Sequence, residues 1–306
     1  MTFVQKVNKN VLQFKSFVIF ASNRKETKMS FYPQPNKYQC GPFALKYALV
    51  MIGIFKDEDQ IGIIAGSTWW AGTDEFGLSR AARRFECKMK HFQSSNPDDA
   101  RRMLINELKK GHPCILSVKN WEHWHTVVSY QKGKFVVIDS ELDKVVSVLT
   151  STQLLRLWKY VEKGTDIRSY DGYALIPKFK VTTRAKFTPE KAKYLMYDKN
   201  EDLAKKFDQY TNDLINICNP RTKLSYNFIT FSEFLRRNEQ NLIKRVANWH
   251  GEPTYSELKK ILSNMKFVAE VYDLIVPEDE EKRAAIDLAS ILMLYSCGKY
   301  GMTPIY

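Results

Sequence analysis

The sequence has few cysteines and no long apolar run. Among its 306 residues are five cysteines, an odd number with no pair in CxxC spacing, at positions 40, 87, 114, 218 and 297. Neither a disulfide framework nor a metal site is therefore predicted, and a reducing, cytoplasmic location is expected. No apolar run approaches the ~20 residues of a membrane-spanning helix, so no membrane span is expected either.

The start of the chain offers one ambiguous stretch. Residues 11–22 resemble a weak signal peptide, but Lys15 interrupts the apolar part and Ala21-Ser22 makes a poor cleavage site. Secretion is accordingly the lesser alternative. A competing interpretation takes Met29 as the true start, which leaves residues 1–28 as an extension outside the fold.

Positive charge is in excess, with a formal net charge of +13. A lysine-rich surface can neutralise phosphates without any motif, which raises the possibility of nucleic-acid binding. The lysines are scattered, however, and zinc-finger, helix-turn-helix and RNA-recognition signatures are absent from the sequence. A generally basic surface is predicted rather than a nucleic-acid partner.

The patterning divides the chain into two parts. Residues 29–178 combine helical patterns with strands predicted at 113–119, 125–131 and 134–140, the last two joined as a hairpin by the Lys132-Gly133 turn. After about residue 179 the patterns are almost entirely helical. We therefore predict an α+β domain over 29–178, followed by an all-helical C-terminal region over 179–306.

Cys40 stands directly before a Gly-Pro pair and an apolar helical run, residues 43–54. If a helix begins there, the sulfur lies over unsatisfied backbone N–H groups at the positive end of the helix dipole, which favours a thiolate nucleophile. Pro42 suits the first helical turn because its missing N–H has no partner there in any case. The alternative is that Cys40 is a small buried hydrophobic residue.

A cysteine nucleophile needs a base and a group that orients the base. His123 and His125 begin an apolar strand, and strand alternation puts both side chains on one face, so spacing alone does not choose between them. Asp139 ends the partner strand of the hairpin. Counting back across the turn brings Asp139 opposite the His125 end, where an imidazole-orienting carboxylate is needed.

Together these residues resemble the bacteriocin-processing, double-glycine leader peptidase domain, a family of papain-like cysteine peptidases. The resemblance covers residues 29–178, and its motifs are Gln34 six places before Cys40, the Cys-Gly-Pro helix start, Gly72-Thr73 with Gly77-Leu78 and Ala81-Ala82-Arg83, the His-Thr-Val-Val strand, and Asp139. It implies a papain-like α+β fold in which a helix carrying the cysteine packs on an antiparallel sheet carrying the histidine and the aspartate.

The resemblance also implies roles for single residues. Cys40 resembles the nucleophile, Gln34 the side-chain oxyanion donor, His125 the general base and Asp139 its orienting group. The chain departs from the family at Gln39, where an acidic residue is frequent, and at Ser140, where the family commonly has proline after the aspartate.

The function expected from these residues is that of a stand-alone cysteine peptidase or a related amide hydrolase or acyltransferase, acting on a peptide or protein without a cofactor. Family members are commonly fused to a membrane exporter, for which this sequence has no span. The C-terminal region is a candidate site for a protein partner. The alternative is a non-catalytic papain-like module whose basic surface binds an anionic partner.

Overall fold

The computed structural model describes residues 31–222, 225–248 and 253–299. The possible signal-like stretch and the predicted extension over residues 1–28 lie outside these residues. Among the described helices, none combines the length and apolar composition required to cross a bilayer.

The first half of the chain is built around one seven-stranded antiparallel sheet in the order β1-β7-β2-β3-β4-β5, with β6 paired to β7. The strands are β1 (Cys87–Ser94), β2 (Cys114–Val118), β3 (His123–Gln131), β4 (Lys134–Ile138), β5 (Val146–Thr150), β6 (Tyr160–Val161) and β7 (Arg168–Pro177). The helices are η1 (Lys37–Gln39), α2 (Cys40–Val50), α3 (Glu58–Ala65), α4 (Glu75–Arg84), α5 (Pro97–Lys109) and α6 (Ser151–Trp158).

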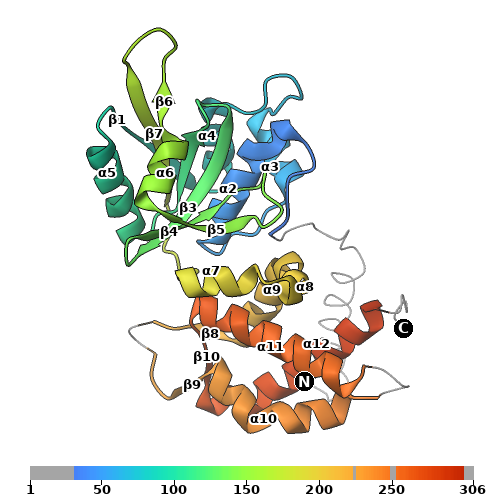
Figure 1. Ribbon diagram of the computed structural model, residues 1–306. Helices are drawn as coiled ribbons and strands as arrows, with labels where there is room; N and C mark the ends of the chain where they lie inside the picture. Colours follow the sequence, from blue (N-terminus) through green and yellow to red (C-terminus); the bar gives the residue numbers. More distant parts are fainter. Residues whose placement is uncertain (1–30, 223–224, 249–252, 300–306) are drawn as a thin grey trace, which may run out of the picture.

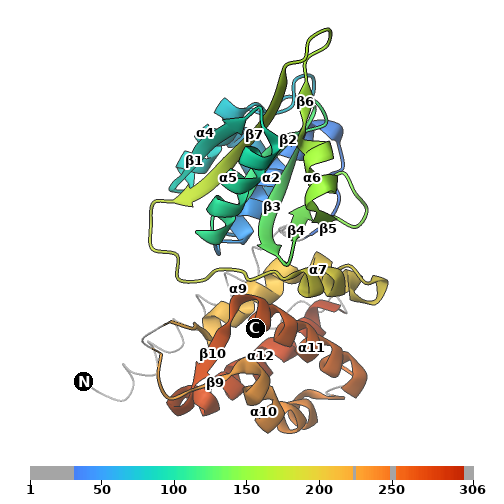
Figure 2. The ribbon, with the colours of Figure 1, turned by 60° about the vertical axis from the view of Figure 1, so that its left-hand side comes forward.

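Helices cover both faces of this sheet (Figures 1 and 2). Helices α2, α3 and α4 enclose one apolar core that includes Leu45, Leu78 and Ile115. On the other face, α5 and α6 enclose a second core with Leu104 and Trp158. The predicted fold class, a cysteine-bearing helix packed on an antiparallel sheet that carries histidine and aspartate, is confirmed.

Local sequence signals account for several element boundaries. The Asn96 side chain accepts hydrogen bonds from the first backbone N–H groups of α5, and Pro97 occupies the first helical position. The β3–β4 hairpin turns at Lys132 and Gly133, which both have positive φ, 50° and 77°. Two successive residues of this kind form the tight turn whose twist matches that of paired strands.

The second half is mainly helical, as predicted. It contains α7 (Pro189–Leu195), η2 (Asp198–Asn200), α8 (Glu201–Lys205), α9 (Phe207–Ile217), α10 (Phe231–Val246), α11 (Tyr255–Tyr272), η4 (Glu278–Glu280) and α12 (Glu281–Lys299). The prediction that this half is all-helical is wrong in one respect, because it also has a small sheet in which β10 (Leu274–Pro277) pairs with β8 (Asn219–Pro220) and β9 (Phe228–Thr230).

The two halves share a large apolar core. Phe43 and Tyr47 of α2 belong to the same buried cluster as residues of α9, α10 and α11, and the Tyr272 hydroxyl donates a hydrogen bond to the Val50 carbonyl at 3.0 Å. Residues 178–188 between them contain no helix or strand. The division into 29–178 and 179–306 stays a prediction, because this shared core joins α2 directly to the second half.

Candidate active site

Cys40 is the first residue of α2, and its side chain is buried. The next position, Gly41, has no room for a side chain, because Thr73 of the α3–α4 connection lies against the start of the helix. A Cβ at Gly41 would come within 2.8 Å of the Thr73 Cβ. The first N–H groups of a helix have no partner within it and carry partial positive charge. The thiol is thus buried at the N-terminal end of α2.

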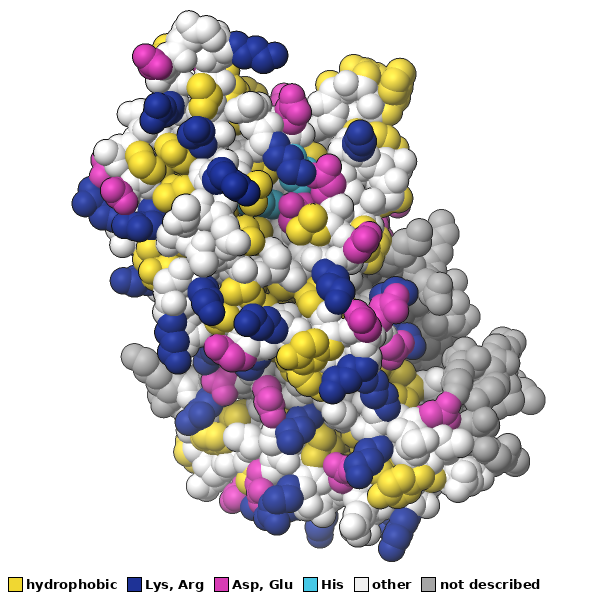
Figure 3. Space-filling view, in the orientation of Figure 1, with side chains coloured by type: hydrophobic (Ala, Val, Ile, Leu, Met, Phe, Trp, Pro, Cys, Tyr) yellow, Lys and Arg dark blue, Asp and Glu magenta, His cyan; other side chains and the backbone are white. Residues whose placement is uncertain are grey.

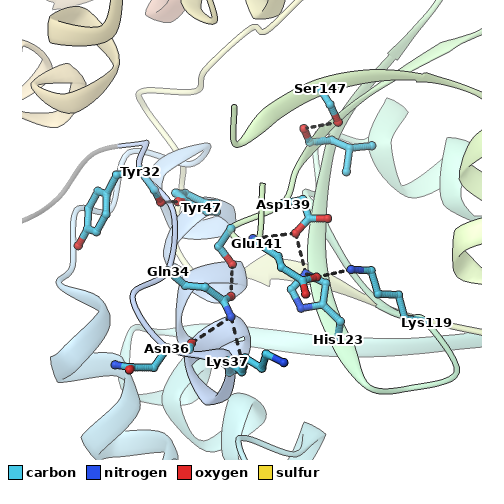
Figure 4. Close-up of polar contacts among 12 residues, drawn as sticks. Tyr32, Gln34, Asn36, Lys37, Tyr47, Lys119, His123, Asp139, Glu141 and Ser147 are labelled. Atoms are coloured by element: carbon cyan, nitrogen blue, oxygen red, sulfur yellow. Dashed lines mark hydrogen bonds and ion pairs between the residues drawn. The ribbon is translucent and has the colours of Figure 1, made fainter. Parts of the chain in front are cut away.

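His123 lies between Cys40 and Asp139. Its Nε2 is 2.6 Å from Asp139 Oδ1, and both side chains are buried, 5% and 7% exposed; Figure 4 shows the Asp139 contact. Burial by itself would lower the pKa of His123, but the side-chain hydrogen bonds to Asp139 and to Cys40 outweigh it and raise the pKa to about 9. The imidazolium is therefore favoured at neutral pH beside the thiol.

The prediction that His125 is the partner of Asp139 is wrong in this structure. His125 is 1% exposed, and its Nε2 has no hydrogen-bond partner among the described residues. Burial lowers its pKa to about 4, and the nearby Lys119 contributes in the same direction. His125 is thus a neutral, buried side chain, whereas His123 makes the contact with Asp139 that had been assigned to its neighbour.

The buried neutral His125 should make folding sensitive to acid. Its pKa is below the ordinary 6.5 in the folded state, so the unfolded chain binds the proton more readily, and stability present above pH 6.5 is lost as the pH falls toward 4. The fall of the pKa to about 4 corresponds to about 3 kcal/mol. Urea unfolding at pH 7 and pH 4 should therefore show a smaller acid loss in His125→Leu than in wild type, by about 3 kcal/mol. An equal acid loss in both proteins would contradict a buried neutral His125.

Asp139 is fixed by the turn that follows β4. Its backbone N–H donates to the Val145 carbonyl at 2.7 Å, and its Oδ1 accepts the Glu141 N–H at 3.0 Å. Burial would raise the pKa of Asp139, but the hydrogen bond and charge of His123 outweigh this and lower the pKa. The carboxylate is therefore ionised and rigidly placed to orient the imidazole.

Gln34 lies beside this turn but does not point a free amide at the thiol. Its Nε2 donates to the carbonyls of Asn36 and Lys37 at 3.0 and 3.2 Å, as Figure 4 shows. Its Oε1 accepts from the Ser140 hydroxyl at 2.6 Å, and its backbone N–H donates to the Ser140 carbonyl at 2.7 Å. The structure thus brings Gln34 to the residue next to Asp139, with its amide hydrogens used by its own loop.

Ser140 is the feature of this site that sequence reasoning missed. In the sequence Ser140 is only a departure from the proline common in the family, yet in the structure its hydroxyl anchors the amide of Gln34. The serine that replaces proline after Asp139 was the sequence signal from which this contact could have been suspected. The Asp139-Ser140 pair therefore orients both His123 and Gln34.

Among the residues that the structure describes, two groups of side chains could hold a metal ion. The ligand atoms of His123, Asp139 and Glu141 lie within 4.8 Å of one another, and the same is true of a second acidic cluster formed by Asp57, Glu58 and Asp59. In the first group His123 is already bonded to Asp139, and Glu141 forms an ion pair with Lys119. That arrangement is a hydrogen-bonded relay among the side chains themselves.

The surface around the site is mixed in charge. In Figure 3 histidine appears in a recess of the face shown, and Lys and Arg side chains are interspersed with Asp and Glu over both halves of the molecule. On this face there is no continuous basic patch of the kind that tracks a nucleic-acid backbone.

No protein-family model matches the chain, and no curated protein matches it either. Among solved structures, this chain is similar to the peptidase domain of Streptococcus ComA, a bi-functional ABC transporter involved in a quorum sensing pathway. The two are 17% identical, with a TM-score of 0.38. The match covers 49% of this chain and 99% of the ComA domain. A double glycine motif protease from an AMS/PCAT transporter, in complex with the leader peptide, is also 17% identical, with 96% of it covered by 51% of this chain and a TM-score of 0.38. The matched structures are peptidase domains. They are of the kind that the sequence motifs of residues 29–178 resemble.

Proposed function

We propose that this protein is a cysteine hydrolase that cleaves a peptide or related amide bond through an acyl-enzyme formed on Cys40. The observation that carries the proposal is the buried relay in which His123 is hydrogen-bonded to Asp139 at 2.6 Å and interacts with the Cys40 thiol. This is the arrangement of nucleophile, base and orienting group that acyl transfer requires. The peptide nature of the substrate is taken from the motif resemblance.

The proposed reaction starts from an ion pair in which the proton of the Cys40 thiol already resides on His123. The thiolate attacks the carbonyl carbon, and a C–S bond forms as the carbonyl π electrons move to oxygen. The Cys40 backbone N–H and the Gln34 amide are the proposed donors to this oxyanion. The C–N bond then breaks, and the leaving amine takes the proton from His123.

Water completes the cycle. His123 removes a proton from water as its oxygen attacks the thioester carbon, and the C–S bond breaks to release the acid and the Cys40 thiolate. Asp139 stays ionised throughout and stabilises the imidazolium. The roles assigned from the resemblance to Cys40, Asp139 and Gln34 are kept in this proposal, and His123 replaces His125 as the base.

Selective alkylation at acid pH tests the proposal. At pH 6 iodoacetamide should modify Cys40 at least about tenfold faster than the buried Cys87, Cys114 and Cys218. Burial raises the pKa of Cys87 to about 11 and that of Cys218 to about 12, and it holds the pKa of Cys114 well above its ordinary value. Peptide mapping by mass spectrometry identifies the modified residue, and Cys40→Ser provides the control.

The rival function, a non-catalytic binding module, predicts a different outcome. A module that binds an anionic partner through its basic surface does not need an activated thiol, so Cys40 would then react as an ordinary thiol. The second half of the chain is the candidate site for a protein partner under either function, and that partner stays a prediction.

A further inference from the structure

The segment that joins β2 to β3 has an unusual backbone. Lys119, Asn120 and Trp121 have φ values of 54°, 56° and 69°. The other non-glycine residues with positive φ among those described occur singly. A left-handed conformation costs an ordinary L-residue roughly 1–2 kcal/mol, so three in succession persist only where the surroundings hold them. This segment ends two residues before His123.

Three contacts from the end of α6 and from β6 hold the segment. The Lys119 N–H donates to the Leu157 carbonyl at 3.0 Å. The Val161 N–H donates to Asn120 Oδ1 at 3.3 Å. The indole of Trp121 stacks on the ring of Tyr160, with centroids 3.7 Å apart and planes 6° from parallel.

The strained segment controls where β3 begins. His123 is the first residue of β3 and pairs with Val118, the last residue of β2, so only four residues close the connection. If the segment relaxed toward the right-handed or extended conformations preferred by its residues, the start of β3 would have to shift with it. The imidazole would then lose its alignment with Asp139 and Cys40.

We propose that Tyr160 is a positioning residue: by stacking on Trp121 it holds the left-handed segment that places His123 between Cys40 and Asp139. Tyr160 belongs to β6, which pairs with the first residues of β7 at the top of the view in Figure 1, and it contributes no group to the site itself. The inference rests on the proposed function, because it assigns Tyr160 a role in orienting the base of that reaction.

The stack is the contact best suited to a test. Trp121 is 49% exposed, so its position depends on the ring beneath it rather than on an enclosing core. The Tyr160 hydroxyl has no hydrogen-bond partner among the described residues, so Tyr160→Phe should preserve the contact and Tyr160→Ala should remove it. Tyr226→Ala is the matched control, because Tyr226 is 82% exposed and lies in the second half of the chain.

The experiment combines two measurements on the full chain. Hydrogen exchange of the amides of residues 119–123 should be faster in Tyr160→Ala by a factor of about 3 to 10. This factor corresponds to the stabilisation that one aromatic pair contributes. The rate of Cys40 alkylation by iodoacetamide should fall by a similar factor at pH 6 but stay unchanged at pH 10, where an ordinary thiol is ionised. Tyr160→Phe and Tyr226→Ala should match wild type in both measurements.

The outcomes separate this inference from the proposed function. Suppose that wild type is alkylated fast at pH 6 and that Tyr160→Ala is alkylated equally fast. This result would overturn the role of Tyr160 and leave the proposed function standing. Unchanged hydrogen exchange in Tyr160→Ala would also overturn it. A wild-type profile typical of an ordinary thiol would overturn the proposed function and the role of Tyr160 with it. A loss of rate that is equal at pH 6 and pH 10 would reveal a general structural defect and count against positioning.

Discussion

His123→Ala should lower the rate at which iodoacetamide alkylates Cys40 at pH 6 by roughly 10- to 100-fold, whereas His125→Ala should change it less than about threefold. An ordinary thiol, with a pKa near ~8.5, is less than ~1% ionised at pH 6, so fast alkylation there requires an activating neighbour such as an imidazolium. The pKa of His123 is raised to about 9, so this residue carries the charge at pH 6; the pKa of His125 is lowered to about 4, so that one does not.

The pH profile gives the same test a second readout. Wild-type alkylation should vary little from pH 6 to pH 8, because the thiolate–imidazolium pair persists until His123 loses its proton near its pKa of about 9. In His123→Ala the rate should instead rise about tenfold for each pH unit until the isolated thiol is ionised. All three proteins should converge near pH 10. If His125→Ala lost the fast alkylation at pH 6 and His123→Ala kept it, His125 and not His123 would be the base.

The position of Cys40 could be predicted because every signal for it is local. A cysteine before Gly-Pro and an apolar helical run predicts a helix start, and α2 begins at Cys40. The hairpin was predictable for the same reason, since the turn at Lys132 and Gly133 lies between two apolar strands. Such signals depend on a few neighbouring residues, and the tertiary contacts of this fold agree with them.

The choice between the two histidines could not be made in this way. The β3–β4 register shifts between Val127 and Ser129, so one strand contributes an extra residue to the pairing. Such an irregularity changes which residues oppose one another across the two strands. Ile138 pairs with Thr126, so this register continued by one residue puts Asp139 opposite His125. The Asp139 carboxylate nevertheless bonds to His123. Asp139 lies beyond the last paired residue of β4 and is held by the following turn, so counting along the strands does not show where its side chain points.

Two other features depended on long-range contacts. The hydroxyl of Ser140 bonds to Gln34, a residue 106 positions away, so the meaning of Ser140 appears only in the folded chain. The small sheet of the second half consists of strands of two to four residues, Asn219–Pro220 among them. Runs this short are too brief to display the alternation that predicts a strand.

Gln34→Ala should slow acylation of Cys40 by p-nitrophenyl acetate by about 10² to 10³, the usual effect of losing one oxyanion donor, while changing its alkylation by iodoacetamide less than about twofold. The two reagents separate the roles at the site, because acylation forms an oxyanion at a carbonyl carbon and alkylation does not. Gln39→Ala is the matched control: Gln39 adjoins Cys40 in sequence, but its amide donates toward Asp59 at 3.4 Å.

The hydrogen bonds of the Gln34 amide explain how it could reach an oxyanion. Gln34 Nε2 donates to two neutral backbone carbonyls, and a charged oxyanion is a stronger acceptor that should displace one of them. The Ser140 hydroxyl holds the other end of the amide at Oε1 during this exchange, so Ser140→Ala should lower acylation in the same direction but by less than Gln34→Ala. If Gln34→Ala acylates as fast as wild type, the amide serves only to close the loop at Asn36 and Lys37, and the Cys40 backbone N–H has to stabilise the oxyanion without it.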